Sequence, residues 1–377
     1  MRVLMVSPSY FPIKGGAETV IHDISNKLNN KKGIQTAILT FNMDRKWCPY
    51  WHGRIEQYNG ITVYKIPALN WFPLTHSDRI TMGVNLIPGR FRKILREYDV
   101  LHFHGGDLTF PLFSFGVKKP KIFHCHGLSQ EFYKRYFISR LILKNAAHIY
   151  ICLTNTMKKE LIDVGIPGNK VRVLPNGIDT NIFHPEGEKE ENQILFVGRV
   201  CREKGIDTLI KALTYLKTPT NLTIIGPEDW NPGHFSQILE LIRKENEKGK
   251  HKIVYLGAKT RGEIIKYYQK ASMFVLPSQR EGFPMVILEA LACETPVITT
   301  NVDGIAEILQ NNECGIIIPP NNPQKLAEAI QFLLDDKKTR TKFGWKGREM
   351  VEKCFSMDAV VEKLCKIYDE TISKFSG

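Results

Sequence analysis

Short apolar runs alternate with amphipathic segments along the whole chain, and this alternation predicts parallel β-sheets whose strands are joined by helices. A helix is expected over 17–29, where Val20, Ile21, Ile24 and Leu28 share one face. Strands are expected at 3–7, 36–40, 63–66, 100–103, 121–124, 149–153, 194–197, 222–225, 253–256, 274–276, 297–299 and 315–318. Further helices are expected at 206–216, 263–270, 285–293, 323–334 and 357–375. The pattern is typical of the α/β class.

A polar stretch at 179–191, with Pro185 and a run of Glu and Lys, interrupts this pattern and is predicted to be a linker. A chain of 377 residues is long for a single hydrophobic core. We therefore expect two domains, 1–178 and 179–356, each built around its own sheet. The long connection from 41 to 60 carries Trp47 and Trp51, and connections of this length are usually functional or mobile.

The net charge of +13 lies entirely in the first half of the chain. Residues 1–180 hold 25 Lys and Arg against 12 Asp and Glu, whereas 181–377 hold 27 of each sign. This asymmetry indicates an anionic partner for the first half, such as lipid head groups, polyphosphates or nucleic acid. No apolar run reaches the roughly 18–20 residues of a spanning helix, and no signal-peptide pattern opens the sequence. The eight cysteines show no C-x-x-C spacing and are predicted to be reduced cytosolic thiols.

The loop at 281–284 is predicted to open at the carboxyl edge of a sheet, between a strand and a helix whose first position suits Pro284. Free N–H groups around Phe283 and Met285 would face a phosphate or a sugar hydroxyl. The carboxylates of Glu281 and Glu289 can accept hydrogen bonds from hydroxyls. An ordinary loop acid and a surface acid on a helix are the alternative for this pair.

Arg199 and Lys204 lie in a second strand-to-helix loop, where a guanidinium and an ammonium suit a diphosphate. Two solvated surface cations are an equal alternative. A third such loop contains Gly15 and Gly16, which let the backbone approach a ligand closely. It is neither a P-loop nor a G-x-G-x-x-G loop, and an ordinary tight turn would explain it as well.

Four histidines, His102, His104, His124 and His126, fall at the ends of two expected strands around Cys125. Each H-x-H pair can present two imidazoles on one face of a strand, and Asp107 could complete a zinc site. Core or turn histidines are commoner, and we favour His126 as a single hydrogen-bonding partner of a substrate. Basic segments with apolar or aromatic residues, at 90–93, 118–119 and 132–137, suit either a membrane surface or a solvated face.

Six motifs in order resemble the GT-B retaining glycosyltransferases of family 4 over nearly the whole chain. They are Gly-Gly-Ala-Glu at 15–18, Asp-Val-Leu-His-Phe-His at 99–104, His-Gly-Leu at 126–128, Val-Leu-Pro-Asn-Gly-Ile-Asp at 173–179, Val-Gly-Arg with Glu-Lys-Gly at 197–205, and the E-x7-E run at 281–289. The resemblance implies two Rossmann-like domains facing a cleft, with the helix at 357–377 crossing back to the first. It also implies transfer of a sugar from a nucleotide diphosphate sugar to a glycan or lipid-linked acceptor, with retained anomeric configuration.

The same resemblance assigns roles residue by residue. Arg199 and Lys204 would bind the donor pyrophosphate, and Glu289 the ribose hydroxyls. His126 and Glu281 would be catalytic, contacting the sugar being transferred. The donor-binding positions are Gly15, Gly16, Arg199, Lys204, Gly282, Phe283, Pro284 and Glu289. Two departures are that 31–36 lack the family's usual Gly-His-Glu, and that Pro284 replaces a more frequent glycine and has no amide proton.

The resemblance implies that no metal or other cofactor is required. We expect a cytoplasmic enzyme that docks on the inner face of an anionic membrane through its basic half and binds no nucleic acid. The acceptor is expected near 47–51 and Trp71. Two rival classes are a metal-dependent hydrolase using the H-x-H pairs and a basic nucleic-acid-binding protein, although no recognised nucleic-acid motif is present.

Overall fold

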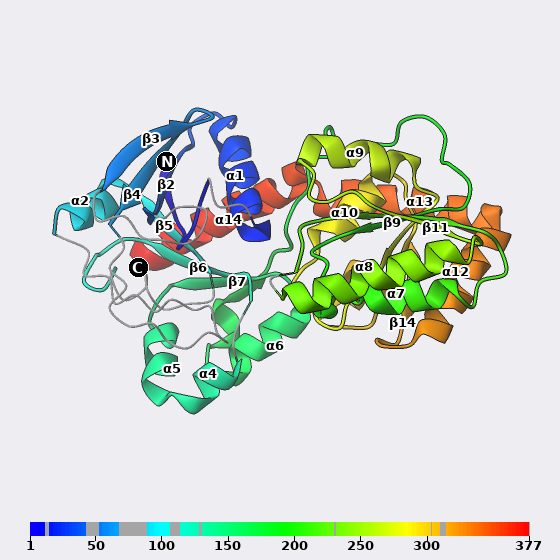
Figure 1. The fold of residues 1–377 in the computed structure, drawn as a ribbon. Coiled ribbons are helices and arrows are strands. Elements are labelled where there is room, and N and C mark those ends of the chain that lie inside the picture. Colours follow the sequence, from blue (N-terminus) through cyan, green and yellow to red (C-terminus); the bar gives the residue numbers. More distant parts are fainter. Residues whose placement is uncertain are drawn as a thin grey trace. The chain divides into compact units, whose positions relative to one another are not determined.

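The computed structural model describes residues 1–11, 15–42, 53–67, 89–105, 114–127, 130–229, 231–302, 304–309 and 314–376. The chain divides into two compact units (Figure 1). The first comprises Met1–Gly177 with Met357–Gly377, and the second comprises Ile178–Ser356. The division falls one residue before the expected boundary, and the last helix belongs to the first unit.

The first domain is built on an eight-stranded sheet in the order β3-β4-β2-β1-β5-β6-β7-β8. Every pair of neighbours is parallel except β3 and β4, which are antiparallel. The strands are β1 (Arg2–Val6), β2 (Gln35–Phe41), β3 (Arg54–Tyr58), β4 (Ile61–Ile66), β5 (Val100–Gly105), β6 (Lys121–Cys125), β7 (Ile149–Cys152) and β8 (Val171–Val173). The helices are α1 (Gly16–Asn29), α2 (Gly89–Glu97), α4 (Gln130–Arg135), α5 (Phe137–Lys144), α6 (Asn155–Asp163) and α14 (Met357–Ser376).

The second domain is built on a six-stranded parallel sheet in the order β11-β10-β9-β12-β13-β14. Its strands are β9 (Gln193–Val197), β10 (Asn221–Ile225), β11 (Lys252–Tyr255), β12 (Met273–Leu276), β13 (Val297–Thr300) and β14 (Gly315–Ile318). Its helices are α7 (Ile206–Leu213), α8 (Pro232–Glu247), α9 (Arg261–Lys270), α10 (Met285–Ala292), α11 (Ile305–Ile308), α12 (Pro323–Asp335) and α13 (Lys337–Met350).

Burial on both faces explains why the central strands are almost entirely apolar. All four residues of β12 are buried, as are the last four of β1. Parallel strands covered by helices on both sides have this composition, whereas a half-exposed strand would alternate. The helices complete the layers with amphipathic faces, as in α1, where Val20, Ile21 and Leu28 are buried. Two Rossmann-like α/β domains result, as predicted.

Two expectations about the chain's organisation are corrected by the structure, and several elements were not predicted. Part of the stretch expected to form a linker packs into the second domain, where Phe183 is fully buried, whereas residues 185–188 are exposed. The Lys189 ammonium donates to the Tyr268 carbonyl at 3.0 Å, the Cys293 carbonyl at 2.8 Å and Thr295 Oγ1 at 2.7 Å. The strands β3 and β8 lie outside the expected elements, as do the helices α2, α4, α5, α6, α8, α11 and α13, and β3 lies within what was predicted to be one long connection.

Each sheet contains one point at which the strand order reverses. In the first domain β1 lies beside β5, and in the second β9 lies beside β12. The loops that leave such neighbours at their carboxyl ends diverge to opposite faces, which opens a crevice where α/β proteins bind ligands. No helix among the described residues is long and apolar enough to cross a membrane. None of the seven cysteines that the structure describes forms a disulfide.

Candidate functional site

The loops after β9 and β12 carry most of the predicted donor-binding residues and flank the reversal point of the second sheet. Arg199 follows β9 by two residues, and its loop is fixed by hydrogen bonds from Gly198 N–H to the Ile225 carbonyl at 2.9 Å and from Val200 N–H to the Pro227 carbonyl at 3.0 Å. Arg199 is partly buried. The strand order therefore places the loop that carries Arg199 at the edge where a ligand is expected.

Gly205 brings the two loops into direct contact. It has φ +67°, and a Cβ added to it would lie 2.0 Å from the Pro277 carbonyl oxygen, so no side chain fits. Pro277 directly follows β12, and Gln279 N–H donates to the Glu203 carbonyl at 2.8 Å. A left-handed glycine thus allows one loop to lie against the other.

Lys204 and Glu281 meet across this contact. Lys204 Nζ donates to Glu281 Oε1 at 2.6 Å, and Ser278 Oγ donates to the same oxygen at 2.6 Å. The Glu281 side chain is 5% exposed and that of Lys204 is 27% exposed, so the acid is buried while the ammonium borders solvent. Charge-assisted bonds of this length hold both groups firmly. An ammonium has three N–H donors, which leaves Lys204 donors for a second acidic ligand.

The segment after Glu281 leads into the N-terminus of α10. Gly282 is exposed, Phe283 is partly buried with its ring 6.3 Å from that of Phe355, and Pro284 is buried. Helix α10 begins at Met285, as predicted, and Pro284 is its N-cap residue rather than its first helical residue. No side chain caps the helix. Ile287 N–H donates to the Pro284 carbonyl at 3.1 Å, and the N–H groups of Met285 and Val286 come before the first intrahelical acceptor, so they can bind an anionic ligand.

Glu289 lies on α10 and is held by a buried tyrosine. Its Oε2 accepts a hydrogen bond of 2.8 Å from the Tyr268 hydroxyl. Burial, then the negative charge of Glu289, raise the pKa of Tyr268 well above its usual range, so the hydroxyl remains a donor. The tyrosine fixes one carboxylate oxygen and so orients the other.

Gly15 and Gly16 lie in the first domain, at the start of α1. Gly15 is the N-cap residue, and a Cβ there would lie 2.5 Å from Glu18 Oε2. The Glu18 carboxylate is buried and accepts a hydrogen bond from Ser9 Oγ. Gly16 has no atom within 4 Å of the position of a Cβ, so space is open beside it. The glycines therefore leave room both for an internal carboxylate and for an external group.

The four histidines form one cluster at the carboxyl ends of β5 and β6. His102, His104 and His124 are buried, whereas His126, the first residue after β6, is partly buried. His104 Nδ1 and His126 Nε2 lie 3.0 Å apart. Burial lowers the pKa of His126 to about 4, and holds those of the other three well below the usual 6.5. All four imidazoles are therefore neutral at physiological pH.

Three of these histidines lie close enough to one another to be candidate metal ligands. Candidate ligand atoms of His102, His104 and His124 lie within 4.8 Å of one another. Two ligands of one tetrahedral zinc ion lie only about 3.4 Å apart, and lone pairs must converge on it. The rings of His102 and His124 are stacked at 5° with centroids 5.4 Å apart. Asp107, the expected additional ligand, lies outside the described residues, as do 47–51, Trp71 and Leu128.

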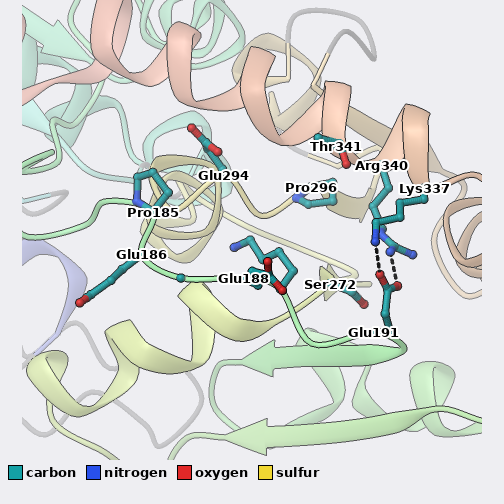
Figure 2. Close-up of a pocket in the computed structure, with 12 residues that line it drawn as sticks. Pro185, Glu186, Glu188, Glu191, Ser272, Glu294, Pro296, Lys337, Arg340 and Thr341 are labelled. Carbon is teal, nitrogen blue, oxygen red and sulfur yellow. Dashed lines mark hydrogen bonds and ion pairs between the residues drawn. The ribbon is translucent and has the colours of Figure 1, made fainter.

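A cavity of about 480 Å³ lies elsewhere in the second domain (Figure 2). Ser272 and Pro296, which line it, directly precede β12 and β13, so it lies at the amino edge of the sheet, opposite the candidate site. Glu191 pairs with Lys337 and Arg340 across it, and the Lys337 hydrogen bond contributes most to lowering the Glu191 pKa. Glu191, Lys337 and Arg340 are engaged with one another, and the Lys189 ammonium donates to two carbonyls and a hydroxyl, so we assign the cavity no ligand.

Several contacts at these sites were missed by sequence reasoning. Ser278 precedes Glu281 by three residues, and this S-x-x-E spacing was a usable signal. The Tyr268 contact to Glu289 and the His104 contact to His126 join residues from different elements, and no local pattern reveals them.

Comparisons with solved structures and with curated proteins show which class of proteins has this fold and these loops. A structure of HepE from Anabaena in complex with UDP-glucose matches with a TM-score of 0.76 and 17% identity, covering 98% of this chain and 100% of that one. This likeness shows the GT-B fold. Among curated proteins, a glycosyltransferase of capsular polysaccharide biosynthesis from Staphylococcus aureus is 31% identical over 289 residues, 70% of this chain and 74% of that protein. An uncharacterized glycosyltransferase of Methanocaldococcus jannaschii is 29% identical over 383 residues, 98% of both.

Family models match both domains. The model described as Glycosyltransferase Family 4 matches residues 14–182, and that described as Glycosyl transferases group 1 matches residues 178–350. The chain belongs to these glycosyltransferases, as the resemblance predicted. Neither rival class, the metal-dependent hydrolase nor the nucleic-acid-binding protein, is favoured by these comparisons.

Proposed function

We propose that the enzyme transfers a sugar, with retained anomeric configuration, from a nucleotide diphosphate sugar to a glycan or lipid-linked acceptor. The observation that carries this proposal is the Lys204–Glu281 pair at the reversal point of the second sheet. A carboxylate that is already buried and bonded would accept sugar hydroxyls, while the ammonium beside it has donors for phosphate oxygens.

The other residues are assigned by position. Arg199 joins Lys204 on the pyrophosphate, and Glu289, oriented by Tyr268, accepts from ribose hydroxyls. Gly282 and Phe283 supply backbone amides to the donor sugar, and Pro284 ends the loop at the uncapped start of α10. From the first domain, Gly15 and Gly16 approach the phosphates and His126 contacts the transferred sugar.

The chemistry follows from charge development. Cleavage of the bond between sugar and phosphate leaves an oxocarbenium-like sugar and a diphosphate whose negative charge grows. Fixed cations and amides stabilise that charge best where water is excluded. The leaving phosphate oxygen takes the proton of the attacking hydroxyl on the same face, which retains the configuration. Arg199, Lys204 and the N-terminus of α10 supply the positive charge, so the proposal needs no metal.

The names of relatives support the substrate class. HepE was crystallised with UDP-glucose, and the Staphylococcus aureus relative is described as acting in capsular polysaccharide biosynthesis. A polymer built on a lipid carrier would place the acceptor at a membrane. We therefore propose that the basic first domain docks on the anionic inner face of the membrane.

The test is transfer from a panel of UDP-, GDP- and ADP-sugars, with the anomeric configuration of the product read by NMR. We expect one donor to be used with retention. Lys204→Ala and Glu281→Gln should lower kcat/KM at least about a hundredfold while circular dichroism stays unchanged. Lys211→Ala is the matched control, because Lys211 is an exposed lysine of α7 paired only at 3.5 Å with Asp207 among the described contacts. An inverted product would overturn the mechanism, and full activity of both site variants would overturn the site.

A further inference from the structure

The helix α5 of the first domain exposes an apolar face, which is separate from the candidate donor site on the loops of the second domain. Phe137, Ile138 and Leu141 are 68%, 70% and 51% exposed, while Ser139 and Leu143 are buried on the opposite side. Positions 137, 138 and 141 fall on neighbouring faces of a helix, so the three side chains form one continuous patch. Exposed apolar residues that gather in this way mark interaction sites more often than isolated ones do.

Positive charge borders this patch. Arg140 and Lys144 lie on α5 beside Phe137 and Leu141, and Lys134 and Arg135 end the neighbouring α4, which contacts α5. The Arg140 guanidinium lies 5.6 Å from the centre of the Phe137 ring. No Asp or Glu occurs in the sequence between 132 and 159. An apolar face with cations at its rim is complementary to a bilayer with anionic head groups.

We propose that Phe137, Ile138 and Leu141 insert into the interfacial region of an anionic bilayer, with Lys134, Arg135, Arg140 and Lys144 contacting its head groups. This rests on the proposed function in one respect, since it names the surface by which the first domain docks on a membrane. The two α4–α5 helices lie together in the first domain (Figure 1), so they can enter the interface as one unit.

The test is sedimentation with vesicles of phosphatidylcholine, with and without phosphatidylglycerol. The wild type should bind only the anionic vesicles, and the variant F137S/I138S/L141S should bind at least about tenfold more weakly. The matched control Y215S/F332S/W345S removes three exposed hydrophobic residues of the second domain and should bind as the wild type does. Equal binding by both triple variants would overturn the proposal. A second result would also overturn it: the wild type forms a dimer in ultracentrifugation and binds no vesicles, and F137S/I138S/L141S abolishes the dimer. The exposed face of α5 would then join two copies of the chain.

Sugar transfer to a soluble acceptor separates this inference from the proposed function. If the wild type transfers sugar but does not bind anionic vesicles, only the proposal of a docking face is overturned. A wild type that binds vesicles through α5 but transfers no sugar leaves the docking face in place and overturns the enzyme assignment.

Met5, His104 and His126 form a hydrogen-bonded line that fixes the tautomer of His126. His104 Nε2 lies 3.4 Å from Met5 Sδ, and a thioether sulfur only accepts hydrogen bonds. His104 Nε2 therefore carries the proton. Because burial keeps His104 neutral, its Nδ1 has no proton and must accept the 3.0 Å bond from His126 Nε2–H. The two rings lie within 17° of coplanar, which suits this bond.

The geometry points to His104 as a positioning residue that leaves His126 Nδ1 with a free lone pair directed to substrate. His126 then accepts a hydrogen bond from a sugar hydroxyl and does not donate one. This rests on the proposed contact between His126 and the transferred sugar. Met5 and His104 lie on neighbouring strands β1 and β5, at the reversal point of the first sheet, so the fold itself sets the tautomer.

Two variants test this assignment. His104→Asn retains an acceptor near the position of Nδ1 and should keep kcat within about threefold, whereas His104→Phe removes it and should lower kcat about tenfold to a hundredfold with little change in KM. Nitrogen-15 NMR of the histidine rings, with His126→Gln to identify the signal, should show His126 protonated at Nε2. In Met5→Leu, a substitution of similar volume, a second tautomer should appear. Protonation of His126 at Nδ1 in the wild type, or unchanged kcat in His104→Phe, would overturn the assignment, and the NMR result holds whether or not sugar is transferred.

Discussion

Acidification should destabilise the first domain through its buried histidines. His102, His104 and His124 are 0%, 3% and 1% exposed, and burial, with a smaller contribution from neighbouring imidazoles, lowers the pKa of each well below 6.5. Below pH 6.5 these three histidines bind protons in the unfolded chain, whereas they stay neutral in the folded domain. Stability is therefore full above that pH and falls as the pH decreases.

The size of the effect follows from linkage. A histidine that stays neutral in the folded state and has an unfolded pKa of about 6.5 contributes about 1.4 kcal/mol to the loss between pH 7.5 and pH 5.5. Three such residues give a loss of about 4 kcal/mol, which is a large part of a typical domain stability of roughly 5–15 kcal/mol.

His124 offers the sharpest single substitution, because neither of its ring nitrogens has a hydrogen-bond partner among the described residues. Between pH 7.5 and pH 5.5, the free energy of unfolding of His124→Leu should fall by about 1.4 kcal/mol less than that of the wild type. The packing cost of the substitution is the same at both pH values, so it cancels when the two pH values are compared. Ile122→Val on the same buried strand is the control, since its cost should not depend on pH.

The assay is urea unfolding at both pH values, followed by hydrogen exchange of peptides from β5 and β6, because two domains need not unfold together. If His124→Leu and the wild type lose the same stability between pH 7.5 and pH 5.5, His124 is not held neutral in the folded domain. The reasoning from burial would then be refuted.

Further outcomes concern the second domain. Gly205→Ala should destabilise it by about 3 kcal/mol or more, because a Cβ would meet the Pro277 carbonyl oxygen at 2.0 Å at a φ of +67°. Gly262→Ala, on α9 with open space around the new Cβ, should stabilise it by roughly 0.5–1 kcal/mol in the same thermal unfolding experiment, and equal effects would contradict the close-approach argument. Tyr268→Phe should raise KM for the nucleotide sugar about threefold to tenfold with little change in kcat, because Glu289 loses the hydroxyl that orients it. Steady-state kinetics decides this, and an unchanged KM would show that the tyrosine only fills the core.

Local pattern was sufficient for most of the fold and for the positions of the candidate loops. The strands that bury both faces were found because they are apolar throughout, and Pro and Gly residues marked the loops between them. The edge strand β3 (Arg54–Tyr58) was missed because four of its five residues are exposed and the fifth is Glu56, so the strand carries little apolar signal. Hydrophobic periodicity cannot detect a strand of this kind.

The predictions for helix α13 and for the expected linker at 179–191 were wrong for a different reason. The helix has few apolar residues, and it packs through Gly344 and Gly347, whose added Cβ atoms would meet Glu294 O and Leu291 Cδ2 at 2.4 and 2.5 Å. Lys189 made 179–191 look solvated, yet its ammonium is buried against two carbonyls and a hydroxyl of the second domain. Contacts of this kind depend on the distant partner, which a local pattern does not contain.

The same limit applies to the site. Lys204 and Glu281 could be proposed one by one from their loops, but their 2.6 Å contact requires β9 and β12 to be neighbours. The Lys204–Glu281 distance thus depends on strand order, and strand order is a property of the whole domain.

The most direct test of the central claim is equilibrium binding of UDP, GDP and ADP by calorimetry. We expect one of the three to bind the wild type, Lys204→Ala to weaken that binding at least about tenfold, and Lys211→Ala to leave it unchanged. If a nucleoside diphosphate binds the Lys204→Ala variant as tightly as the wild type, the loops after β9 and β12 do not hold the leaving diphosphate, and the proposed mechanism fails.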